Sequence, residues 1–112
     1  MDLGKDLVAA SSTSLVLAIL AEGESYGYAI IKRVKDLSDG ELLWTDGMLY
    51  PVLHRMERNG LVASKWVSPS SGRRRKYYRL TKAGRAELEA ERKRWQMVDE
   101  TLHRVWMKTC LA

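Results

Sequence analysis

The chain has 112 residues, of which 46% are hydrophobic and 29% charged, and its formal net charge is +5 at pH 7. A chain of this length forms one unit with a modest core, and a single cysteine excludes an intramolecular disulfide framework. The longest apolar run, residues 15–21, is too short to cross a bilayer. We therefore expect a cytoplasmic protein without a membrane segment, and the positive charge favours an anionic partner such as nucleic acid.

The N-terminal part predicts helices. Residues 3–8 indicate a short amphipathic helix, and the polar residues 11–14 either interrupt it or lie within it. Residues 15–21 are apolar almost all round, which predicts a buried helix. Gly23 is suited to end this helix, and Ser25 is suited to cap the next one.

Two further helices are predicted before residue 60. Apolar side chains recur at helical spacing from residue 26 to 37, which indicates the second helix. Thr45 or Asp46 can cap the third. Pro51 has no N–H group to donate, so we expect the regular part of the third helix to begin only near Leu49.

A strongly basic β-hairpin follows. Residues 61–67 and 75–80 have strand-like patterns, separated by the turn-forming residues 68–72. Four consecutive cations, Arg73 to Lys76, lie at the tip and on the returning strand. Alternation places Lys76, Tyr78 and Leu80 on one face of that strand, so we expect one of the two adjacent tyrosines to be buried and the other to lie at the surface.

Thr81 is suited to cap a long final helix. Apolar residues spaced like the seam of a coiled coil indicate that this helix packs on another helix. We expect a DNA-binding domain at residues 1–80 and a dimerisation helix at residues 81–112. The predicted dimer seam consists of Leu88, Trp95, Val98, Leu102 and Val105.

This order of elements predicts a mainly α fold with a β-hairpin, a winged helix-turn-helix followed by a long C-terminal dimerisation helix. In such a module the third helix enters the major groove and the hairpin lies along the phosphates. Cations on the hairpin supply affinity that does not depend on base sequence. The predicted DNA-binding residues are Asp46, Gly47, Met48, Tyr50, His54, Arg55, Arg73, Arg74, Arg75, Lys76 and Tyr77.

Four segments together resemble the PadR family of bacterial transcriptional regulators. They are YGYAII at 26–31, GMLYPVLHRME at 47–57, GLV at 60–62 and RRKYYRLT at 74–81. The resemblance covers roughly residues 15–88 and implies a homodimer whose final helix supplies much of the interface. Met48 departs from the family, which usually has Ser or Thr there, so a thioether replaces a hydroxyl at the front of the recognition helix.

The short final helix resembles that of the compact, multidrug-sensing members of the family. In those proteins a tryptophan from each final helix stacks on a flat, apolar, often cationic ligand at the dimer centre. The resemblance places Trp95 in this role, with Val98 and Asp99 nearby. For Trp95, an ordinary place in the dimer interface is the alternative.

Other function classes have less support in the sequence. We expect no enzyme and no cofactor, because a phosphate-binding loop, a His-Glu metal motif and a nucleophile elbow are all missing from the sequence. Cys110 and His103, seven residues apart, leave a metal-responsive regulator as one alternative. A protein-interaction module that does not bind DNA is the other alternative. Salt-sensitive DNA affinity distinguishes a DNA-binding regulator from such a module.

Overall fold

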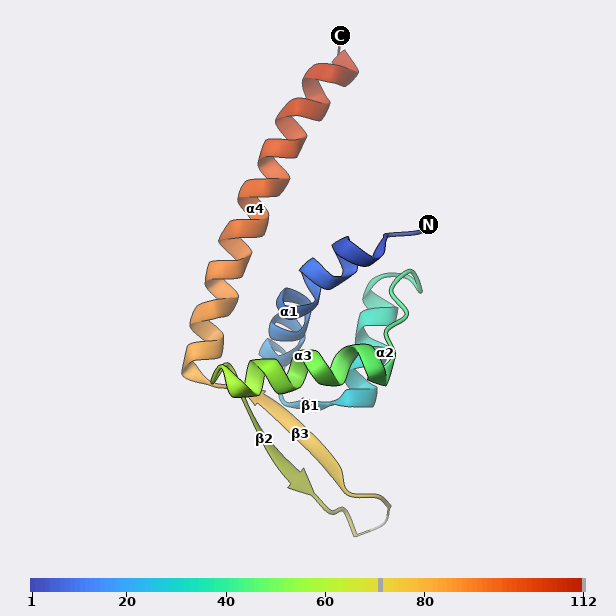
Figure 1. Ribbon diagram of the computed structural model, residues 1–112, viewed down its shortest axis with the longest axis vertical. Coiled ribbons are helices and arrows are strands. Elements are labelled where there is room, and N and C mark those ends of the chain that lie inside the picture. Colours follow the sequence, from blue (N-terminus) through green and yellow to red (C-terminus); the bar gives the residue numbers. More distant parts are fainter. Residues whose placement is uncertain (71, 112) are drawn as a thin grey trace.

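The structure is a computed structural model that describes residues 1–70 and 72–111, with side chains up to residue 109. Three helices form a compact body, a β-hairpin extends from it, and a long last helix leaves in the opposite direction (Figure 1). The elements are α1 Lys5–Ala21, β1 Ser25–Tyr26, α2 Gly27–Leu37, α3 Asp46–Arg58, β2 Val62–Val67, β3 Arg75–Leu80 and α4 Lys82–Leu111.

The opening residues form one helix rather than two. The polar residues 11–14 lie within α1, and the hydroxyls of Ser11 and Ser12 donate to the carbonyl oxygens of Leu7 and Ala9 at 2.8 and 2.9 Å. These bonds satisfy the hydroxyls inside the helix, so Ser12 can be buried. The second half of α1 supplies core side chains, as the apolar run predicts.

The prediction that Ser25 caps the second helix is wrong. Ser25 and Tyr26 form the short strand β1, which pairs with β3, and α2 begins after Tyr26 without a side-chain cap. Pairing with β3 holds this segment extended, and that long-range partner is not visible in the local sequence. Gly23 follows the C-cap Glu22 of α1 and has a φ of +147°, which favours glycine.

The third helix begins earlier than Pro51 suggests. The Thr45 side chain accepts a hydrogen bond from the Met48 amide at 3.3 Å, and α3 runs from Asp46, with Pro51 inside it. The expected start near Leu49 is therefore wrong. The capped first turn forms despite the hydrogen bond that Pro51 cannot donate, because four buried side chains of α3 fix the helix to the core.

The three strands form an antiparallel sheet in the order β1-β3-β2. Opposite Lys76 lies Trp66, and opposite Tyr78 lies Ser64, so these four side chains share one face of the hairpin. Leu80 lies on the same face, and both Tyr78 and Leu80 are buried, as strand alternation predicts. The turn predicted at residues 68–72 includes Ser71, which lies outside the described residues.

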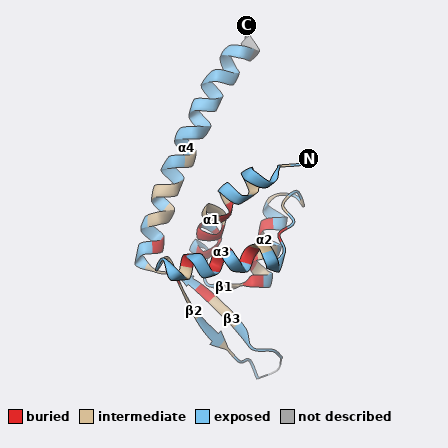
Figure 2. Ribbon diagram, in the orientation of Figure 1, coloured by how far each residue is buried: buried red, intermediate tan, exposed pale blue. Residues whose placement is uncertain are grey.

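The core lies where α1, α2, α3 and the base of β3 meet, and most of α4 is exposed (Figure 2). At the start of α4, Thr81 accepts from the Gly84 amide at 3.0 Å and donates to the carbonyl of Gly60 at 2.6 Å. The predicted cap is confirmed. A Cβ on Gly84 would overlap the carbonyl oxygen of Leu61, so α4 approaches the start of the hairpin at backbone distance.

The molecule measures 63 × 30 × 21 Å along its principal axes. The long axis runs from the hairpin tip to the far end of α4 (Figure 1). The first part of α4 packs on α1, and the rest extends beyond the body. In the part of the chain that the structure describes, no helix has both the length and the apolar character needed to cross a membrane.

Candidate nucleic-acid interface

One face of α3 is turned to solvent. Asp46, Gly47, Tyr50, His54 and Arg55 are exposed, as a recognition role requires, while the opposite face of α3 is buried in the core. Met48 lies at the border: it is half-buried and packs against the core cluster. Of the residues predicted at the front of α3, Met48 is therefore the least accessible.

Tyr50 owes its position to a glycine on another helix. A Cβ on Gly27 would lie 2.6 Å from the Tyr50 hydroxyl, so this side chain crosses directly over the first residue of α2. The ring of His54 lies one turn further along, with its centroid 6.2 Å from that of Tyr50. Arg55 points toward α1, where its guanidinium lies 3.5 Å from the Thr13 hydroxyl.

The cationic residues of the wing, defined as β2, β3 and their turn, do not form a uniform patch. The Arg74 guanidinium lies 4.8 Å from the Trp66 ring centroid, and that of Arg75 lies 4.5 Å from the Tyr26 ring. Such cation–π contacts orient the guanidinium while its N–H groups stay available. Strand alternation places Arg75 and Lys76 on opposite faces, and Lys76 faces α3.

The two tyrosines of β3 also lie on opposite faces. Tyr77 is half-buried, and its ring lies 5.2 Å from that of Tyr26 in β1. Tyr78 is 1% exposed, and its hydroxyl has no hydrogen-bond partner among the described residues. Burial, with smaller contributions from the charge of Glu57 and from Tyr50, raises the pKa of Tyr78 to about 12.

A cleft of about 640 Å³ lies between the start of α2, the exposed face of α3 and the wing. Its walls are mainly aromatic and cationic, and most of the predicted DNA-binding residues line it. The lining residues are Tyr26, Gly27, Tyr28, Asp46, Tyr50, His54, Trp66, Arg73, Arg74, Arg75, Lys76 and Tyr78.

Two exposed aromatic side chains at this cleft were not predicted. Trp66 is 57% exposed on the wing, although its apolar strand suggests a packing role, and Tyr28 is 70% exposed on α2. Strand alternation could predict that Trp66 lies beside the cations of β3 only if the register of the hairpin were known. Trp44, by contrast, is buried in the core.

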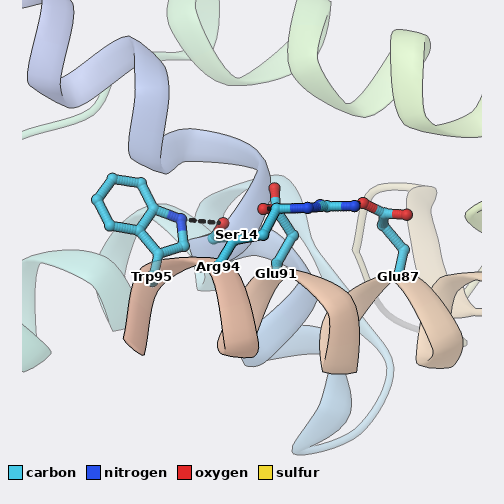
Figure 3. A network of polar contacts seen from close by, with 5 residues as sticks. All are labelled: Ser14, Glu87, Glu91, Arg94 and Trp95. Carbon is cyan, nitrogen blue, oxygen red and sulfur yellow. Dashed lines mark hydrogen bonds and ion pairs between the residues drawn. The ribbon is translucent and has the colours of Figure 1, made fainter. Parts of the chain in front are cut away.

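The predicted ligand residues lie on α4. The Trp95 indole N–H donates to the Ser14 hydroxyl of α1 at 2.8 Å, so the ring packs on its own chain (Figure 3). A cavity of about 280 Å³ between α1 and α4 is lined in part by Trp95 and Leu88. Val98 and Asp99, one turn further along, are exposed.

The predicted dimer seam changes character along α4. Leu88 and Trp95 are half-buried against α1, whereas Val98, Leu102 and Val105 are 50%, 41% and 56% exposed. The exposed part forms an apolar stripe where α4 extends past its own domain.

No group of three metal-binding side chains occurs among the residues that the structure describes. The Cys110 side chain, on which the metal-responsive alternative depends, lies outside that range. His103 lies on α4 with its Nδ1 atom 3.4 Å from the Asp99 carboxylate and its ring 5.8 Å from that of Trp106.

An exposed helix beside a cationic wing defines a winged-helix nucleic-acid-binding fold, and known proteins share it. A transcriptional regulator from Clostridium thermocellum is 26% identical with a TM-score of 0.83, and the match covers 91% of this chain and 96% of that one. A PadR family regulator from Clostridium difficile is 33% identical with a TM-score of 0.74, covering 84% and 96%. Transcriptional regulator YqjI of Escherichia coli is 28% identical over 79% of this chain but only 41% of its own length.

The model of the transcriptional regulator PadR-like family matches residues 16–90. The chain belongs to this family and is a transcriptional regulator. The family consists of DNA-binding regulators rather than enzymes, which confirms the predicted fold class and function class.

Proposed function

We propose that the protein is a homodimeric repressor that binds a pseudo-palindromic promoter site in double-stranded DNA. The observation that carries this proposal is the cleft between α3 and the wing, where exposed polar side chains of α3 adjoin Arg73, Arg74 and Arg75. In this arrangement α3 contacts base edges in the major groove while the arginines contact phosphates. Such a regulator acts in the cytoplasm.

The two parts of the chain divide this work. Residues 1–80 bind DNA, and residues 81–112 form the dimer through α4. The exposed stripe of Val98, Leu102 and Val105 supports dimerisation, because apolar side chains on a helix beyond its own domain need a partner. A two-fold dimer places its recognition helices roughly 34–36 Å apart, one turn of DNA.

A flat apolar or cationic ligand at Trp95 relieves repression. The apolar cavity beside Trp95 supports this part of the proposal. A ligand that changes how α4 packs against its partner helix also changes the separation of the two recognition helices, because Gly84 holds α4 at backbone distance to the hairpin base and the domain moves with the helix. Repression is relieved only if the ligand favours the geometry that fits DNA poorly.

Mobility-shift titrations test DNA binding. The probes are a duplex that the protein selects from random-sequence DNA and a shuffled duplex of equal length, each titrated at two salt concentrations. We expect specific binding that weakens steeply with salt. Absence of affinity for both duplexes at low salt would contradict the proposal and favour a protein-interaction module.

The Arg74→Ala variant tests the phosphate contact of the wing. We expect weaker binding to both duplexes and a salt slope that is shallower by roughly one unit, because one phosphate contact is lost. The matched control is Arg92→Ala, which also removes one positive charge, but from α4, where Arg92 pairs with Glu89. This variant should bind as the parent protein does. A change in sequence preference alone after Arg74→Ala would contradict the assigned role.

A further inference from the structure

Glu57 connects the recognition helix to both strands of the wing. It lies in the last turn of α3, where its Oε2 atom accepts a hydrogen bond from the Ser64 hydroxyl of β2 at 2.5 Å. Its Oε1 atom lies 3.7 Å from the Nζ atom of Lys76 in β3. One carboxylate therefore contacts both strands of the hairpin.

Lys76 differs from the arginines that precede it. Its side chain is 27% exposed, and its ammonium group lies between the Glu57 carboxylate and the Tyr78 ring, 5.5 Å from the ring centroid. Arg74 and Arg75, by contrast, are exposed and stack on aromatic rings. The fourth cation of the basic tract is thus directed at α3 and compensated by an acid.

The small energy of such contacts argues for a role in placement rather than in stability. Glu57 is 36% exposed, and ion pairs that are this open to solvent add little to the stability of the fold. DNA recognition has a stricter geometric requirement, because α3 and the wing must reach base edges and phosphates at the same time. A contact between them that is weak for folding is therefore able to matter for binding.

We propose that Glu57 is a positioning residue that sets DNA selectivity by fixing the wing relative to α3, and that it also lowers sequence-independent affinity by withholding Lys76 from the phosphates. This inference rests on the proposed DNA-binding function. Free cations raise affinity for every DNA sequence alike. An acid that occupies one cation therefore lowers non-specific binding, while its bond to Ser64 supports the geometry needed for the specific site.

The test compares Glu57→Gln with Glu24→Gln in titrations with the selected and the shuffled duplex. Both changes remove one carboxylate from a wing lysine and alter the net charge equally. Glu24 lies 3.5 Å from Lys65, whose side chain is on the other face of β2 from Ser64. Thermal melting of each variant shows whether the fold is retained.

We expect Glu57→Gln to bind the shuffled duplex more tightly and to steepen the salt slope by about 0.9, the contribution of one additional phosphate contact. The ratio of specific to non-specific affinity should fall roughly 3–10-fold, the change that corresponds to one net hydrogen bond. The melting temperature should match that of Glu24→Gln. In the double variant Glu57→Gln with Lys76→Met, the increase in the salt slope should disappear, whereas the ratio of specific to non-specific affinity should stay low.

Ser64→Ala separates geometry from charge. It removes the bond to β2 without altering any charge, so we expect a lower affinity ratio with an unchanged salt slope. If Glu57→Gln and Glu24→Gln show the same ratio and slope while the parent protein binds the selected duplex, the inference is wrong and the proposed function stands. If the parent protein binds neither duplex, both are wrong.

Discussion

At the scale of single residues, a glycine decides where a side chain of the proposed DNA-binding face lies. Gly27 leaves the space that the Tyr50 hydroxyl occupies, although the two residues belong to different helices. Glycine is otherwise unfavourable in a helix by roughly 0.5–1 kcal/mol. Its presence at the first residue of α2 is therefore explained by Tyr50 rather than by the helix.

Gly27→Ala is expected to lower DNA affinity without lowering stability. The new methyl group displaces the mobile end of Tyr50 from the cleft, while the helix gains the advantage of alanine. Mobility shift and thermal melting measure the two effects separately. Tyr50→Phe in the same background removes the atom nearest the new methyl group, so recovery of affinity in the double variant would support this reason, and a large loss of stability would contradict it.

The raised pKa of the buried Tyr78 hydroxyl leads us to expect a loss of stability at alkaline pH. Its pKa is about 12 in the folded protein, above the ordinary value of 10.0, so unfolding favours its ionised form. The free energy of unfolding keeps its full value below pH 10. It falls by roughly 2–3 kcal/mol as the pH rises toward 12, for a pKa shift of this size.

Tyr78→Phe should remove this part of the pH dependence, as measured by denaturant unfolding at a series of pH values. Near neutral pH the variant should be as stable as the parent protein or slightly more so, because it deletes a buried hydroxyl without a partner among the described residues. Tyr28→Phe, at an exposed tyrosine, is the control. An unchanged alkaline loss in Tyr78→Phe would contradict the assignment.

At the scale of elements, the base of the hairpin and the start of α4 meet at backbone distance. Thr81 caps α4 and bonds to Gly60, while Gly84 lies against the backbone of Leu61. This junction fixes the direction in which α4 leaves the domain. The position of α4, the proposed dimerisation helix, is thereby coupled to the base of the wing.

Gly84→Ala should destabilise the protein by roughly 1–3 kcal/mol, because its Cβ meets a backbone carbonyl that cannot rotate away. Gly47→Ala, also at a helical glycine, has its nearest neighbouring atom at 3.9 Å and should be neutral or stabilising. Denaturant unfolding of the two variants measures the difference. Equal stabilities would show that α4 can shift without cost.

At the scale of the whole molecule, α4 provides more apolar surface than its own domain covers. Its distal half extends away from the body at the end opposite to the wing (Figure 1). The stripe of Val98, Leu102 and Val105 is continuous with Leu88 and Trp95, which pack on α1. A partner helix would extend this same packing.

Leu102→Asp should shift the protein toward monomer, because it places a charge in the centre of the exposed stripe. Sedimentation equilibrium measures this change, and DNA affinity should fall with it, since each half-site then binds alone. Met97→Asp is the matched control: Met97 is 62% exposed but lies on another side of α4. Equal effects of the two changes would contradict the predicted seam.

Local sequence determined much of this protein. Helical and strand periodicity, the Thr81 cap and the four consecutive cations predicted the order of elements and the winged helix, because these signals act over a few residues. The family motifs then indicated a regulator, and the family model agrees.

The tertiary structure decided what depends on distant partners. Pairing with β3 makes Ser25 part of a strand, and the burial of one side of α3 keeps the helix continuous at Pro51. The register of the hairpin exposed Trp66 beside Arg74 and directed Lys76 at Glu57. The sequence alone shows four equivalent cations, whereas packing in three dimensions gives Lys76 a different partner from Arg74 and Arg75.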